Sequence, residues 1–401
     1  MLRVLWCSAT QNRRYPEASA ARAASTLAAI ASLAFDPEDT GTKSRTDRGT
    51  RALLMPSLYT IQSVSRRRRP VPLPIRDGLN PSRVRVPAAP GNASVTALEL
   101  LVAAVEGQTH RHPDDGAAAI DARFAAGLVV DAAGRPLAPD ARLKPGADVW
   151  FYRRPAPEPA IAGAMPILHR DENIVVVDKP PFLATTPRGR HITETAVVRL
   201  RRELRDGDLI PAHRLDRLTA GVLVFVARPE ARGAYQNLFA EPGAVVKRYE
   251  ALTRPPQPSD LPGPPFTLAT RQEKIRGILQ ARTIPGEPNA RTIVEGIDRI
   301  VPDDAHLPAE AALWKLTPLT GRTHQLRLHL HELGFPILGD PLYPDVLPAD
   351  AEDPAHPMHL LCRELAFDDP VTGARRVFRS RRSVLEPAAD GTTDTPPPHQ
   401  T

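Results

Sequence analysis

The sequence has little cysteine and no long apolar run. Cys7 and Cys362 are the two cysteines among 401 residues, so at most one disulfide can form. This usage favours a reducing compartment, and we expect a cytoplasmic protein. The longest apolar candidate, residues 26–35, is far shorter than the roughly 20 residues of a membrane-spanning helix, so we expect no membrane partner.

Positive charge is scarce outside the first part of the chain. Residues 1–85 contain 15 Lys and Arg against 6 Asp and Glu, whereas the remaining residues contain 37 against 40. The net charge of the larger part therefore gives no support for nucleic-acid binding. Any such site there must be a local patch of basic side chains.

A metal or nucleotide-cofactor site also lacks support in the sequence. His324, His329 and His331 do not share one helical face, and no cysteine or carboxylate cluster completes a ligand set. Gly321 and Gly339 are single glycines without the repeated spacing of a phosphate-binding loop. We therefore expect no metal and no other cofactor.

Composition divides the chain into four segments. Residues 1–85, which include the run Arg66–Arg69, lack sustained periodicity, and we expect a disordered basic tail or a misassigned start. Residues 86–155 are expected to form a small domain of two helices followed by strands and turns. Residues 160–385 should form the main domain, and residues 388–401 a disordered tail.

The main domain is expected to mix strands and helices. A Pro- and Gly-rich excursion over residues 255–288 is expected to be irregular. Apolar runs predict strands at residues 173–178, 221–227, 244–253, 289–297 and 312–320, and a hairpin at 364–380. Amphipathic spacing predicts helices at residues 194–204, 228–241 and 322–334.

The segment from His213 to Gly221 carries the strongest chemical signal. Asp216 stands among His213, Arg214 and Arg217, directly before an apolar strand. Nearby cations favour the charged form of a carboxyl group, so Asp216 should be ionised. That state suits a nucleophile better than a general acid. Taken alone, the same pattern is equally typical of a surface ion-pair cluster.

Together with residues 316–343, this segment resembles the RluA-type pseudouridine synthases. The family pattern HRLD, two variable residues and Thr-Ser-Gly matches residues 213–221, except that Ala220 replaces the serine. The pattern TGR-x-HQ-x-R, a helix and GHPILGD then matches up to Asp340, except that Phe335 replaces a histidine. Weaker matches lie at residues 171–180 and 247–252, so that the resemblance covers roughly residues 160–385.

The resemblance implies a fold and an activity. The fold is α+β, with a mixed, largely antiparallel sheet, flanking helices and a central cleft. The activity is isomerisation of uridine to pseudouridine in structured RNA, either rRNA or tRNA, without a metal or redox step. We expect a monomer that does not act on DNA. Residues 86–155 resemble a small αL-type RNA-binding domain, but their helix pair is acidic, which makes them a degenerate copy.

The resemblance also implies roles for individual residues. Asp216 is the nucleophile, Arg327 is the basic residue paired with it, and Tyr249 stacks on the flipped uracil and helps to remove the proton from carbon 5. Arg214 helps to displace the target base. The implied catalytic residues are Asp216, Tyr249 and Arg327, and the implied substrate-binding residues are Arg214, Lys179 and His213.

Two other functions are compatible with parts of the sequence. A catalytically inactive RNA-binding or RNA-folding factor on the same fold is suggested by Ala220 and by the acidic small domain. A glycosidase that acts on nucleosides would need a second carboxylate paired with Asp216, and the motif around Asp216 contains none.

Overall fold

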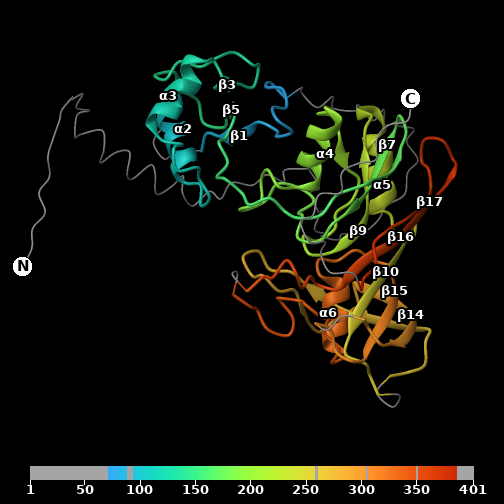
Figure 1. Cartoon of the computed structure of the whole chain (residues 1–401). Coiled ribbons are helices and arrows are strands. Elements are labelled where there is room, and N and C mark those ends of the chain that lie inside the picture. Colours follow the sequence, from blue (N-terminus) through green and yellow to red (C-terminus); the bar gives the residue numbers. More distant parts are fainter. Residues whose placement is uncertain (1–70, 88–93, 258–260, 304–305, 349–350, 386–401) are drawn as a thin grey trace, which may run out of the picture. The chain divides into compact units, whose positions relative to one another are not determined.

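The computed structural model describes residues 71–87, 94–257, 261–303, 306–348 and 351–385 (Figure 1). The described residues form two compact units, of which one comprises residues 71–76 together with those of Asn80–Ala156. The other comprises Asp77–Leu79 and the described residues from Pro157 to residue 385. The predicted tails up to residue 70, with Arg66–Arg69, and from residue 388 lie outside the described residues. No helix in the described ranges is long and apolar enough to span a membrane.

The smaller unit packs two helices against short strands. Its helices are α2 (Ala97–Glu106) and α3 (Ala117–Ala125), and its strands are β1 (Ser82–Arg85), β2 (Val95–Thr96), β3 (Val130–Asp131), β4 (Arg142–Leu143) and β5 (Asp148–Phe151). Leu100, Ile120 and Phe151 are buried together in its core.

Some acidic residues of this helix pair have structural partners. The Thr96 hydroxyl accepts a hydrogen bond from the Glu99 backbone N–H, and the Glu99 carboxylate accepts one from Thr96, which forms a capping box. The buried Asp115 forms a 2.7 Å ion pair with Arg123. Part of the acidic character therefore stabilises the helices themselves.

The expectation that residues up to 85 lack structure is wrong at its end, because Ser82–Arg85 form β1. This strand pairs antiparallel with β5, Arg85 bonds to Asp148 at 2.9 Å, and the Arg83 guanidinium lies 5.9 Å from the Trp150 ring centre. Four residues are too few to give a periodicity signal. Their partners lie more than 60 positions away, so the strand depends on tertiary pairing.

The larger unit is built on a ten-stranded sheet. The strand order is β11-β14-β15-β10-β16-β9-β7-β6, with β17 paired to β16 and β8 to β9. The strands are β6 (Ile167–Arg170), β7 (Ile174–Lys179), β8 (Ile210–Pro211), β9 (Ala220–Val226), β10 (Val245–Thr253), β11 (Phe266–Thr270), β14 (Ala290–Ile300), β15 (Ala311–Pro318), β16 (Leu360–Asp368) and β17 (Arg375–Arg379). The predicted mixed, largely antiparallel sheet is confirmed.

Helices cover the two halves of this sheet (Figure 1). Helices α4 (Ala196–Leu204) and α5 (Arg232–Ala240) contribute Leu200 and Tyr235 to a core with β7 and β9. Helix α6 (Gln325–Glu332) contributes Leu330 to a second core with Trp314 of β15. The core residues named here lie in strands and helices that the sequence predicted.

Two predicted elements differ from the structure. The excursion over residues 255–288 was expected to be irregular, but Phe266–Thr270 form β11, because Phe266 and Leu268 pack against the second core. The helix predicted from residue 322 begins at Gln325. Its start is displaced because His324 adopts a left-handed conformation, with φ 59°, at the N-cap.

One parallel pair joins the two halves of the sheet among the described strands. Leu361 and Cys362 of β16 pair with Ala220 and Gly221 of β9. Gly221 has φ +110°, and a Cβ atom there would lie 2.2 Å from the Cys362 carbonyl oxygen. Only glycine fits this approach.

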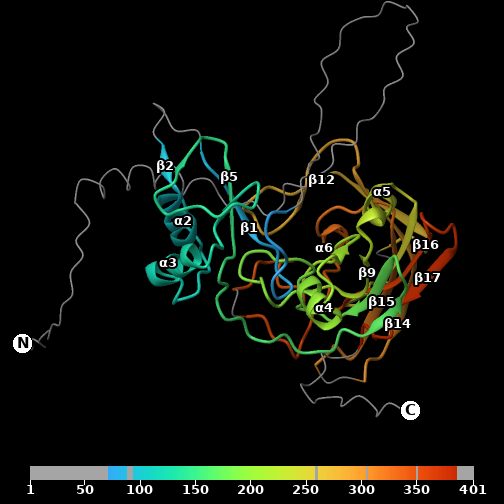
Figure 2. The ribbon, with the colours of Figure 1, turned by 90° about the horizontal axis from the view of Figure 1, so that it is seen from above.

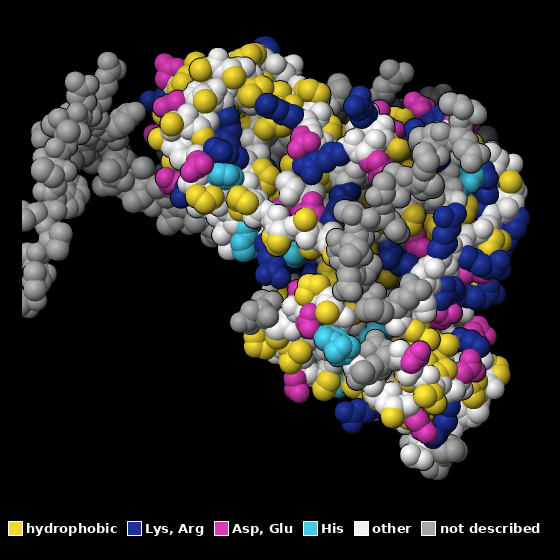
Figure 3. Space-filling view, viewed as in Figure 1, with side chains coloured by type: hydrophobic (Ala, Val, Ile, Leu, Met, Phe, Trp, Pro, Cys, Tyr) yellow, Lys and Arg dark blue, Asp and Glu magenta, His cyan; other side chains and the backbone are white. Residues whose placement is uncertain are grey.

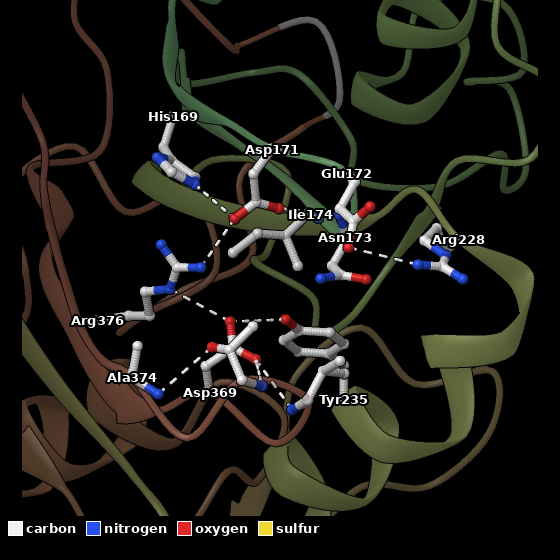
Figure 4. A network of polar contacts seen from close by, with 12 residues as sticks. His169, Asp171, Glu172, Asn173, Ile174, Arg228, Tyr235, Asp369, Ala374 and Arg376 are labelled. Atoms are coloured by element: carbon white, nitrogen blue, oxygen red, sulfur yellow. Dashed lines mark hydrogen bonds and ion pairs between the residues drawn. The ribbon is translucent and has the colours of Figure 1, made fainter.

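A polar network ties the β6–β7 turn to α5 and to the β16–β17 hairpin (Figure 4). Arg376 bonds to both Asp171 and Asp369, and Asp369 also accepts from the hydroxyl of the buried Tyr235. Burial acts to raise the pKa of Asp369, but its hydrogen bonds outweigh this effect and lower the pKa.

Arg and Lys side chains gather over the same hairpin (Figure 3). Arg375 pairs with Asp368, and Arg379 with Glu364. The basic surface of the hairpin is therefore largely neutralised by its own acidic residues, and this leaves little unpaired charge for an anionic partner.

Candidate active site

The loop that carries Asp216 (residues 212–219, the Asp216 loop) is anchored on both sides of that residue. The Thr185 hydroxyl donates to the Leu215 carbonyl at 2.8 Å and accepts from the Leu215 N–H at 3.2 Å. The Lys179 ammonium donates to the Arg217 carbonyl at 3.2 Å. The backbone at Asp216 is therefore held in place by the last residue of β7 and by the chain that follows it.

The Asp216 carboxylate is 37% exposed and faces cationic or polar groups of α6 and its N-cap. Oδ2 lies 3.8 Å from Arg327 Nη1 and 4.0 Å from His324 Nε2. A carboxylate in this position is accessible to a substrate while one of its oxygens is oriented by a fixed cation.

Arg327 is itself held by Asp340. Its Nε and Nη2 atoms donate to the two Asp340 oxygens at 2.7 and 2.6 Å, and both side chains are buried. The guanidinium also lies 5.4 Å from the centre of the Tyr343 ring. Burial acts to lower the pKa of Arg327, but Asp340 and Asp216 outweigh this effect and raise the pKa. Arg327 is therefore a permanent, oriented cation.

His324 is neutral at physiological pH. Burial lowers its pKa to about 4, although the neighbouring Asp216 acts in the opposite direction. Nδ1 lies 3.2 Å from the Tyr343 hydroxyl, so one ring nitrogen is used within the protein. The other nitrogen faces Asp216 as a polar group without a full charge.

Tyr249 lies at a bulge in β10, opposite Leu316 of β15 and Cys362 of β16. The half-buried ring packs against both cores, and the hydroxyl interacts with the Cys362 thiol and, electrostatically, with Asp216. Burial, with the added effects of Cys362 and Asp216, raises the Tyr249 pKa well above its usual range. The hydroxyl is therefore protonated at neutral pH.

The other three predicted site residues differ in placement. Lys179 is fully buried, and its ammonium donates to the carbonyls of Pro180, Leu183 and Arg217, so it acts as an anchor and not as a surface contact. Burial lowers its pKa well below the usual value. Arg214 is exposed on the Asp216 loop.

His213 faces the packed interior. Its ring stacks on Phe239 at 4.5 Å, and Nε2 accepts a hydrogen bond from the Val224 N–H at 3.2 Å. Burial lowers its pKa to about 3. This placement does not support the predicted contact of His213 with substrate. The structure thus brings Asp216, Arg327 and Tyr249 together and leaves the His213 side chain apart from them.

Several site residues were not predicted from the sequence. Asp340, Thr185 and His324 orient the Asp216 site, but each reaches it only through the fold. The signal available for Asp340 was the motif Gly-Asp: Gly339 has φ +74°, and a Cβ there would lie 2.5 Å from the Pro357 carbonyl oxygen. A glycine required in that position fixes the turn that aims Asp340 at Arg327.

A cavity of about 440 Å³ lies on the Asp340 side of the site, and Asp216, Arg327 and Tyr249 do not line it. Phe182, Leu218 and Ile337 form apolar parts of its wall, while Asp340 and Glu352 are among its polar lining residues. The described residues contain no group of three or more His, Cys, Asp or Glu side chains placed to hold a metal ion.

Comparison with known proteins identifies the family. A family model described as RNA pseudouridylate synthase matches residues 173–332. The dual-specificity RNA pseudouridine synthase RluA of Haemophilus influenzae is 30% identical over 229 residues, which cover 56% of this chain and 95% of that protein. The chain belongs to the RluA family of RNA pseudouridine synthases.

Other relatives support the same assignment. An uncharacterized RNA pseudouridine synthase of Synechocystis is 30% identical over 53% of this chain and 70% of its own length. The mitochondrial tRNA pseudouridine(32) synthase of Saccharomyces cerevisiae is 31% identical over 46% of this chain and 38% of its own length. The family match runs from the start of β7 to the end of α6, and so spans Asp216, Tyr249 and Arg327 of this RNA pseudouridine synthase.

Proposed function

We propose that this synthase isomerises specific uridines in structured rRNA or tRNA, with Asp216 as the nucleophile. The observation that carries the proposal is the geometry of Asp216: a partly exposed carboxylate on a loop anchored by Thr185 and Lys179, with Arg327 at 3.8 Å. A nucleophile needs an ionised group that is both accessible and oriented.

The proposed reaction requires the target base to leave its stack. Flipping a base out costs a few kcal/mol. Arg214, which is exposed on the Asp216 loop, is proposed to help displace the target base. The covalent bond to Asp216, at the base or the sugar, allows the bond between ribose and N1 to break. The detached uracil then turns, its carbon 5 bonds to the ribose, and the bond to Asp216 breaks and restores the carboxylate. The proton lost from carbon 5 balances the proton that N1 takes up, so that the reaction is an isomerisation.

Arg327 and Tyr249 have distinct roles in this scheme. Arg327, fixed by Asp340, keeps the Asp216 carboxylate ionised and aimed at the substrate. Tyr249 supports the uracil by stacking. Because its raised pKa keeps the hydroxyl protonated, stacking is the role that the structure favours over proton removal.

The remaining predictions complete the proposal. The enzyme acts as a monomer in this proposal. It works in a reducing compartment such as the cytoplasm, since the chain has two cysteines and Cys362 is a free, buried thiol. The smaller unit is proposed to be a degenerate αL-type domain, because its helix pair is acidic where that of the RNA-binding domain is basic.

Replacing Asp216 with Asn tests the proposal. An amide cannot act as the nucleophile, so tritium release from 5-tritiated uridine in RNA should stop, while the melting temperature stays close to that of the wild type. Asp298→Asn, which removes an exposed acid paired with Lys315, is the matched control and should retain full turnover. Turnover by Asp216→Asn within tenfold of the wild type would contradict the assignment.

A further inference from the structure

Glu352 joins two arginines next to Asp216. Its Oε1 atom is paired with Nη2 of Arg217, and its Oε2 atom lies 3.6 Å from Nη2 of Arg190. One carboxylate thus presents one oxygen to each guanidinium. The three side chains together carry one net positive charge, and Arg217 directly follows Asp216 in the chain.

Arg217 is held in position independently of Glu352. Its backbone carbonyl accepts from Lys179, and its guanidinium lies 5.8 Å from the centre of the Phe182 ring. Its side chain is 20% exposed, so the guanidinium remains accessible from one side. A cation in this position has little freedom to move away when its acidic partner leaves.

Arg190 forms the outer part of the pair. Its side chain is 49% exposed, and its Nε atom contacts the neighbouring His191 ring at 3.3 Å. Burial lowers the pKa of His191, and the charges of Arg217 and Arg190 lower it further. Glu158 and Glu352 act on this pKa in the opposite direction, so His191 lies within reach of both guanidinium groups and of their acidic partner.

Two other cations close to Asp216, Arg327 and Lys179, are already committed to partners within the protein. Arg327 donates from Nε and Nη2 to Asp340 and turns Nη1 toward Asp216, with its side chain 3% exposed. Lys179 is buried, and its ammonium donates to three backbone carbonyls. By contrast, Glu352 is 21% exposed and lies in the coil that precedes β16. Partly exposed ion pairs contribute little to stability, so an external anion can displace this carboxylate at small cost.

We propose that Arg217 and Arg190 bind one phosphate of the RNA backbone beside the target uridine, and that Glu352 occupies the place of this phosphate in the free enzyme. A phosphodiester, like a carboxylate, presents two oxygens that share a single negative charge, which suits paired guanidinium groups. The inference rests on the proposed function, because the target uridine must lie at Asp216. Binding of RNA then requires release of Glu352 from both arginines.

The test measures the Kd of Glu352→Gln and of the wild type for a pool of unmodified transcripts, made of rRNA fragments and tRNAs. The measurement is repeated at several KCl concentrations. The variant keeps the shape but removes the competing charge, so its Kd should fall about two- to fivefold. The plot of log Kd against log salt should steepen by up to roughly 0.7 to 0.9, the increment for one phosphate contact.

Variants of the arginines give the opposite expectation. Arg190→Ala should weaken binding and flatten the salt dependence by a similar increment. The double variant Arg190→Ala/Arg217→Lys lacks one of the two proposed phosphate contacts. Adding Glu352→Gln to this double variant should therefore change Kd less than adding it to the wild type. Glu310→Gln, which removes the acid of the exposed pair with Arg299, is the control and should leave Kd unchanged.

The outcome separates this inference from the proposed function. If Glu352→Gln binds RNA as the wild type does, or more weakly, the inference is wrong even when the wild type forms pseudouridine normally. If Arg190→Ala leaves the salt dependence unchanged, the inference is also wrong. Failure of the wild type to form pseudouridine in the same pool would instead overturn the proposed function.

Discussion

Arg327 forms its closest ion pair with Asp340, at 2.6 Å, and stands 3.8 Å from Asp216. The cation beside the proposed nucleophile is thus positioned by a second, buried carboxylate. Asp340 uses both oxygens on Arg327, and Oδ1 also accepts from the Leu342 N–H at 2.8 Å. This arrangement leaves one arm of the guanidinium, Nη1, to face Asp216.

Asp340→Asn should therefore impair both folding and turnover. Loss of one partner of a buried ion pair leaves the other charge uncompensated, which destabilises by about 3–5 kcal/mol. Turnover should fall more than tenfold under conditions in which the protein remains folded, because Arg327 loses its orientation. Urea unfolding and tritium release measure the two effects. Wild-type turnover in Asp340→Asn would show that Arg327 does not depend on Asp340.

Tyr249→Phe should retain turnover within tenfold of the wild type. The phenyl ring keeps the stacking surface, and the raised pKa makes the lost hydroxyl a poor base at neutral pH. Tyr249→Ala removes the ring and should reduce kcat/KM by about 5- to 150-fold, from a stacking contribution of roughly 1–3 kcal/mol. A loss in Tyr249→Phe as large as in Tyr249→Ala would assign the hydroxyl a role in proton transfer.

Gly221→Ala should destabilise the larger unit by about 2–5 kcal/mol, because φ +110° is unfavourable for alanine and the methyl group would clash with Cys362. Gly233→Ala is the control. Gly233 lies in α5 with no atom near its added Cβ, so alanine should stabilise the helix by about 0.5–1 kcal/mol. Chemical denaturation measures both changes, and equal stability of the two variants would contradict the close approach of β9 and β16.

The Asp369 network should make stability depend on acid. The folded-state pKa of Asp369 is lowered, so its ionised form contributes stability above the unfolded pKa of about 3.9. That contribution is lost as the pH falls through the lower, folded-state pKa. Asp369→Asn should reduce the free energy of unfolding at pH 7 by about 1–3 kcal/mol. The unfolding free energy of the variant should also decrease less than that of the wild type between pH 5 and pH 2. Urea titrations at these pH values provide the measurement.

Deletion of residues 1–70 should leave the modified uridine unchanged. RNA affinity should fall and its salt dependence flatten, through loss of Arg66–Arg69. Deletion of residues 1–85 also removes β1 and should destabilise the smaller unit. Site-resolved pseudouridine sequencing of one RNA pool compares the variants with the full chain. A different modified position after deletion of residues 1–70 would show that this segment determines specificity.

Motifs and apolar runs predicted much of the larger unit. Strands such as β7 and β9 are continuous apolar runs, and their burial on both faces makes them visible in the sequence. Asp216, Tyr249 and Arg327 were found from motif resemblance, and the structure brings them to one site. Lys179, predicted to bind substrate, lies beside the Asp216 loop as a backbone anchor.

The contacts that orient the site could not be predicted. Arg327 was expected to pair with Asp216, but which of two carboxylates lies closer depends on the turn at Gly339, where φ is +74°. The side chain of His213 was expected near the substrate because it stands in the motif. Packing against Phe239 turns it inward, and a local sequence pattern does not record such a contact over 26 positions.

The central position of β16 has a consequence for synthesis of the enzyme. Residues 360–368 pair with both β10 and β9, about 110 and 140 positions earlier in the chain. A nascent chain that has already released the Asp216 loop from the ribosome still lacks the strand that joins the halves of its sheet. Until that strand emerges, the earlier strands expose unpaired edges, which favour aggregation. Ribosome-bound chains ending before residue 360 should therefore depend on chaperones and remain unable to modify RNA.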